Sequence, residues 1–188
     1  MQFTIRMLAA GALAAGLVAL QPSALAQPQG SSGQAAAAPT GVKAEILRSI
    51  EDAEKKIIAL AEKFPQEKYA WHPEGARPTS EAFMHIAAGN YTFATFMGTA
   101  RPDGKTGAVL SKITDKAQVV QTLKESFTHI KAAVANAPDL ETPVKFFGRD
   151  TVVREVLIVS ATHTHEHLGQ LIAYARVNGI VPPWSEPK

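Results

Sequence analysis

Apolar residues recur three and four positions apart along most of the chain, with polar residues between them. This spacing is typical of amphipathic helices, each of which buries one face against its neighbours. Four helical segments are predicted, and each ends at or just before a Gly or Pro: residues 42–64, 79–98, 114–137 and 150–179. No alternating apolar run is long enough for a sheet, so the pattern predicts an all-α four-helix bundle with long loops between the helices.

Short polar residues at the predicted boundaries indicate where three of these helices begin. Thr79 or Ser80 is expected to cap the second helix, and Thr114 with Asp115 is expected to start the third. Asp150 or Thr151 is expected to start the fourth helix. At about 1.5 Å per residue, that helix would be roughly 40 Å long.

The first 40 residues stand apart from the helical pattern. Arg6 precedes the apolar run MLAAGALAAGLVAL and a small-residue site that ends at Ala26, which is the arrangement of a signal peptide. Residues 1–26 are therefore predicted to be removed, and residues 27–40 to form a flexible leader before a domain at 41–188. We expect an exported protein, periplasmic or secreted, with no membrane segment after cleavage.

The composition narrows the range of partners and metal ligands. Hydrophobic residues make up 46% of the chain and charged residues 19%, which is typical of a soluble domain. The net charge of +2 comes without a cluster of Lys and Arg, which argues against a nucleic-acid partner. The chain has no cysteine, so any metal must be bound through nitrogen or oxygen.

Histidines interrupt the apolar faces of the second and fourth predicted helices. His163 and His167 are four residues apart, so both imidazoles can reach one ion from the same helix face. His85 shares a face with the small residues Ala88 and Gly89 and is the expected third ligand. Three imidazoles leave coordination positions open, as in catalytic zinc sites. We predict one divalent ion, zinc first, with nickel, iron or manganese as alternatives.

Two residues beside the pair carry further expectations. Gln170 lies nearly one turn beyond His167 and is expected either to hydrogen-bond to a ligand or substrate, or to pack as an amide between helices. Gly169 predicts close approach of a neighbouring helix, because glycine inside a helix costs about 1 kcal/mol relative to alanine. The remaining histidines are expected to lie outside the site: His72, His129 and His165. The sequence identifies no catalytic residue.

Three segments together resemble the DinB-like superfamily, over roughly residues 42–184: YAWHPEGARPTS, EAFMHIAAGNY and HTHEHLGQLIAYARVNGIVPPW. The resemblance implies a four-helix bundle that binds metal through one His on the second helix and a His-x-x-x-His pair on the last. These positions match His85, His163 and His167, and the Gly-Gln pair that follows in the family matches 169–170. Leu168 stands where many relatives have Arg. The superfamily includes thiol-dependent transferases and isomerases, together with many members of no known reaction.

Three functions remain open at this point. The first is a metal-dependent enzyme of the hydrolase or transferase type, acting on a small molecule that the sequence does not identify. The second is a bundle that binds a metal or ligand without turnover. The third is a metal-free structural or interaction domain, in which the three histidines are satisfied by each other, by water and by backbone. A homodimer is compatible with each of them.

Overall fold

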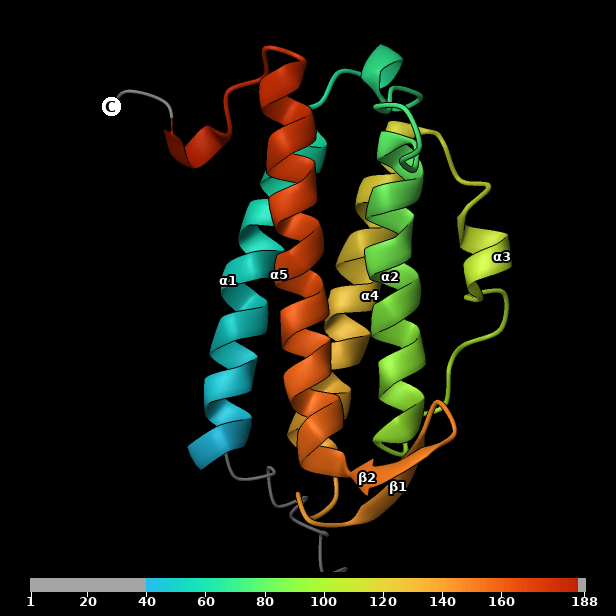
Figure 1. Ribbon diagram of the computed structural model, residues 1–188, viewed down its shortest axis with the longest axis vertical. Helices are drawn as coiled ribbons and strands as arrows, with labels where there is room; N and C mark the ends of the chain where they lie inside the picture. Colours follow the sequence, from blue (N-terminus) through green and yellow to red (C-terminus); the bar gives the residue numbers. More distant parts are fainter. Residues whose placement is uncertain (1–39, 186–188) are drawn as a thin grey trace, which may run out of the picture. The chain divides into compact units, whose positions relative to one another are not determined.

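The computed structural model describes residues 40–185, and helices dominate this part of the chain (Figure 1). Its long helices are α1 (Gly41–Lys63), α2 (Thr79–Phe96), α4 (Lys116–Asn136) and α5 (Val153–Val177). Its short elements are η1 (Gln66–Lys68), α3 (Gly107–Leu110), β1 (Pro143–Phe146), β2 (Arg149–Val152) and η2 (Pro183–Ser185). The predicted signal peptide and nearly all of the predicted leader lie outside the described residues. Between residues 40 and 185, no helix is both long and apolar enough to cross a membrane.

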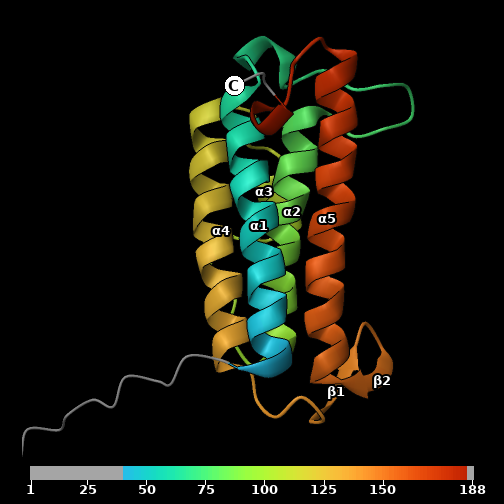
Figure 2. The same ribbon diagram turned by 90° about the vertical axis from the view of Figure 1, so that its left-hand side faces the viewer.

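The long helices lie side by side and pack as a bundle (Figures 1 and 2). Both α1 and α2 pack against α4 and α5. α1 and α5 run in one direction and α2 and α4 in the other, because the connection that contains α3 carries the chain back along α2 before α4 begins (Figure 1). The predicted all-α four-helix bundle with long loops is confirmed.

Each long helix contributes a stripe of buried apolar residues to one core. In α1, Ile50, Ile57 and Leu60 are buried at the spacing that the sequence pattern indicated. In α4, Leu123 and Phe127 occupy equivalent positions one turn apart. The four stripes face inward together, so the polar side chains that share this interior require a specific explanation.

The start predicted at Thr114 and Asp115 was right for α4, and the cap predicted for α2 was wrong. Asp115 precedes α4, and its carboxylate accepts a hydrogen bond from the backbone N–H of Gln118 at 2.9 Å. α2 begins at Thr79, but neither Thr79 nor Ser80 caps it. The hydroxyl and the backbone N–H of Thr79 both donate to the carbonyl of Trp71, each at 2.9 Å. These bonds fasten the loop at 69–78 to the first turn of α2.

The start of the last helix also differs from the prediction. Asp150 and Thr151 lie in strand β2, which pairs antiparallel with β1, and α5 begins only at Val153. The register leaves Phe147 and Gly148 as a two-residue loop, and both have positive φ, 48° and 86°. Such hairpin loops favour Asn-Gly or Asp-Gly, and a left-handed conformation costs an ordinary L-residue roughly 1–2 kcal/mol. Phe-Gly is therefore an unusual choice for this turn.

Candidate metal centre

α2 and α5 bring His85, His163 and His167 together, as the sequence predicted. One ring nitrogen from each lies within 4.8 Å of the others, and the Nε2 atoms of His85 and His163 are 3.3 Å apart. His167 is buried, with 7% of its surface exposed, and the other two are half-buried. Among the residues that the structure describes, this is the one group of three or more potential metal ligands.

The donor set fits a divalent ion. Nitrogens about 2.1 Å from a tetrahedral ion lie about 3.4 Å from each other, close to the 3.3 Å that separates His85 from His163. Closing the longest separation in the group takes a ring movement on the order of 1 Å, which a small change in side-chain torsion supplies. Three imidazoles without a thiolate suit zinc and also other first-row ions such as nickel and iron.

Burial keeps two of the three histidines neutral. Desolvation is the main reason that the pKa of His85 falls to about 4; the charges of Arg77 and His167 act in the same direction, and that of Glu166 opposes them. Desolvation likewise lowers the pKa of His163 to about 3, with contributions from His167 and His85. The neutral imidazole is the form that binds a metal. At pH 7 these two rings therefore need to release no proton before they bind an ion.

A chain of hydrogen bonds orients the ring of His167. Nδ1 of His167 lies 2.8 Å from Oε1 of Gln170, and Nε2 of Gln170 donates to the hydroxyl of Tyr174 at 2.9 Å. That hydroxyl donates to the carbonyl of Arg77 at 3.1 Å. Because the Gln170 oxygen can only accept, Nδ1 of His167 carries the proton and Nε2 keeps its lone pair for an ion. The contact agrees with the ligand hydrogen bond expected of Gln170; a role toward substrate stays a prediction.

Apart from the hydrogen-bonding contact between its Nε2 and Nε2 of His85, packing positions the ring of His163. Its buried Nδ1 has no hydrogen-bond partner among the described residues, and the ring of Phe93 meets it edge to face with 5.1 Å between centroids. The ring also lies close to the backbone of Gly89. A Cβ at position 89 would lie 2.5 Å from Cε1 of His163 and 3.0 Å from Nδ1. Gly89 therefore lets His163 approach α2.

The close approach predicted at Gly169 was wrong. A Cβ there would have nothing within 4 Å, and the residue is exposed. The glycine that allows two helices to meet is Gly89, four residues after His85 on the same helix. Gly89 shares a predicted helix face with His85, but Gly169 lies just as close to a predicted ligand, so the sequence alone does not distinguish them.

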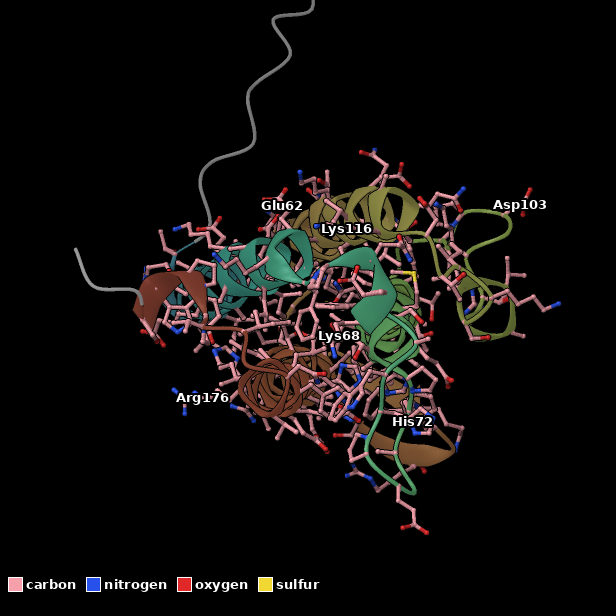
Figure 3. The ribbon with its side chains drawn as sticks, turned by 90° about the horizontal axis from the view of Figure 1, so that it is seen from above. Glu62, Lys68, His72, Asp103, Lys116 and Arg176 are labelled. Atoms are coloured by element: carbon pink, nitrogen blue, oxygen red, sulfur yellow. The ribbon has the colours of Figure 1, made fainter. Side chains whose placement is uncertain are left out.

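The other three histidines lie outside the centre, as predicted. His165 is exposed, and its Nδ1 lies 2.9 Å from the carbonyl of Ala161 on its own helix. His129 belongs to α4 and packs against the ring of Tyr91 with centroids 5.1 Å apart. His72 is exposed on the loop between η1 and α2, which projects from the helices (Figure 3).

Two cavities of different character adjoin His85. One, of about 280 Å³, is lined by the polar side chains of Arg77, Glu81 and Ser111 together with small residues. Arg77 and Glu81 form a partly exposed ion pair at 3.5 Å. The other, of about 550 Å³, is apolar and extends past His163 to the β1–β2 hairpin. Sequence reasoning missed the second cavity because it missed the hairpin that closes one side of it.

Comparison with known proteins agrees with this architecture. A family model described as DinB superfamily matches residues 49–171. The chain is also similar to the crystal structure of a DinB-like protein from Bacillus cereus ATCC 10987, with a TM-score of 0.65 and 18% sequence identity. The match covers 73% of this chain and 93% of that one, and at this identity it shows the fold alone. No curated protein matches the chain.

Replacing Gly89 by alanine is expected to weaken metal binding without unfolding the protein. The new Cβ displaces the His163 ring, which can rotate away, while alanine is the better helix former. We expect the zinc dissociation constant to rise by roughly ten-fold or more, measured by competition with a chelating dye. Gly169→Ala is the matched control and should leave the affinity unchanged. Equal affinities for both variants would contradict the assigned role of Gly89.

Removing the hydrogen-bond acceptor on His167 is expected to lower metal affinity through ring orientation. Gln170→Ala should raise the zinc dissociation constant about 10- to 100-fold, the usual effect of losing such a partner. Gln170→Glu keeps an acceptor for Nδ1–H and should retain most of the affinity. If Gln170→Ala binds zinc as tightly as the unmodified protein, the hydrogen-bond chain has no part in holding the ligand.

Proposed function

This chain belongs to the DinB superfamily, and on that premise we propose that it is an exported enzyme of the hydrolase or transferase type that depends on one divalent ion, zinc first. His85, His163 and His167 would hold the ion. The observation that carries the proposal is their convergence from two helices inside a bundle, with ring nitrogens within 4.8 Å. Unpaired polar groups in such an interior cost roughly 1–3 kcal/mol each, so a shared ligand gives the cluster a physical reason to persist.

The surroundings of the three histidines favour a catalytic metal site over a site that binds an ion without catalysing a reaction. The group contains no fourth ligating side chain among the described residues, which is the pattern of catalytic rather than structural zinc sites. Cavities of about 280 and 550 Å³ adjoin His85, and the larger one falls in the size range of small-molecule sites. A substrate therefore has room beside the proposed ligands.

The bound ion would supply Lewis acidity toward a polar group of the substrate. The protein's own residues would provide position and environment. Gln170 and Tyr174 orient the His167 ring, and Gly89 with Phe93 fixes the His163 ring. Arg77 and Ser111 offer donors in the polar cavity, where they can bind and orient an oxygen-rich part of the substrate.

Metal analysis of the purified mature protein tests the ligand set. We expect one ion per chain in the unmodified protein and a content far below one in His163→Ala, because two imidazoles remain. His165→Ala is the matched control, since that residue is on the same helix but exposed and bonded to its own backbone. Zinc should raise the melting temperature of the control and not of His163→Ala. One ion per chain in His163→Ala would contradict the assignment.

Determining the N-terminal residue of the mature protein tests whether the chain is exported. The signal sequence predicts cleavage after Ala26, so N-terminal sequencing of protein recovered from the periplasm or medium should begin at Gln27. The matched variant Ala26→Arg removes the small residue that the cleavage site needs and should yield unprocessed chain. Recovery of the unmodified protein with residues 1–26 intact and outside the export fraction would overturn this part of the proposal.

A further inference from the structure

The larger cavity beside the histidines is apolar and aromatic. It lies between α2, α5 and the β1–β2 hairpin, and its main apolar walls are Phe93, Phe146, Phe147 and Val159. Apart from His85 and His163, no titratable side chain within residues 40–185 lines it. A charged group in this cavity would lose its hydrating water without gaining an ion-pair partner. The lining therefore favours uncharged ligand groups over charged ones.

Aromatic rings connect the metal centre to the tip of the hairpin without interruption. Phe93 contacts His163 with 5.1 Å between centroids and Phe146 with 6.1 Å. Phe146 in turn contacts Phe147 at 4.6 Å, and Phe96 contacts both of them, at 4.9 and 5.1 Å. The cavity therefore has a continuous aromatic wall from the proposed ligand outward.

Phe147 is not a residue that the conformation of the hairpin turn favours. It is 68% exposed and has a φ of 48°, a backbone conformation that Asn or Gly would adopt with less strain. The Phe147 ring contacts Phe96 and Phe146 but leaves most of its surface exposed, so these contacts alone do not account for an aromatic residue at a strained turn. Backbone strain of this kind is concentrated where ligands bind. Its ring lies at the edge of the cavity, where a bound group would cover it.

We propose that this cavity binds an uncharged aromatic or branched aliphatic group of the substrate, and that the Phe147 ring is in contact with that group. This substrate-binding role adds to the function proposed above and rests on it only for the orientation of the substrate. The polar atoms of the substrate would point toward His85 and the polar cavity. The volume of about 550 Å³ accommodates a group of one to three rings.

An uncharged fluorescent probe, N-phenyl-1-naphthylamine, tests the cavity in the metal-free protein. We expect saturable binding at one site, weakened about ten-fold in Phe147→Asn and nearly unchanged in Phe147→Leu. Val177→Asn, which also removes an exposed apolar side chain at 73% exposure but far along α5, is the matched control and should bind normally. Unsaturable binding, or equal binding by Phe147→Asn and the control, would overturn the proposal.

Thermal unfolding of the same variants separates ligand contact from a structural role. Phe147→Asn should melt at nearly the same temperature as the unmodified protein, because asparagine suits the positive φ of the turn and so offsets the loss of ring contacts with Phe96 and Phe146. A purely structural Phe147 would instead give a lower melting temperature with unchanged probe affinity, and that result would contradict the proposal.

Two hydroxamates distinguish failure of the cavity from failure of the metal site. Acetohydroxamate and benzohydroxamate carry the same chelating group, and only the second has a ring for the cavity. In zinc-loaded protein we expect benzohydroxamate to bind about ten-fold tighter, with the difference lost in Phe147→Asn. Equal affinities would overturn the cavity proposal and leave the metal site standing. Normal naphthylamine binding with neither hydroxamate bound would support the cavity and contradict the proposed function.

Discussion

The contact between α2 and α5 is the constraint on which the proposed centre depends. α5 places two imidazoles one turn apart, but the third comes from α2, so the distance between the helices decides whether all three can share an ion. Gly89 sets that distance locally, since any side chain there would occupy the space of the His163 ring. The chain accepts a poorer helix former at this position because the ring needs the space.

The loops and the hairpin give the centre two chemically different sides. The loop before α2, fastened by Thr79 to Trp71, ends near Arg77 and the polar cavity. The hairpin before α5 carries Phe146 and Phe147 to the apolar cavity. A substrate with one polar and one apolar end would match this arrangement, while the helices between the two cavities hold the imidazoles in place.

The sequence predicted the features that follow from the periodicity of a helix. It did not predict the features that depend on contacts between distant segments of the chain. The three- and four-residue spacing was enough to find the long helices, and the four-residue interval of His163 and His167 was enough to place them on one face. The hairpin escaped because its strands have four residues each and its loop is Phe-Gly. The choice between Gly89 and Gly169 depends on which glycine faces a neighbouring helix, and periodicity within one helix does not settle that.

The most direct test of the metal centre is anomalous diffraction at the zinc absorption edge, from crystals of the mature protein grown with zinc. We expect a single strong peak about 2.0–2.1 Å from one ring nitrogen each of His85, His163 and His167, with Nε2 as the donor of His167. Zinc bound only elsewhere on the chain, with the three rings unchanged and no peak between them, would contradict the claim that this bundle is built around a metal.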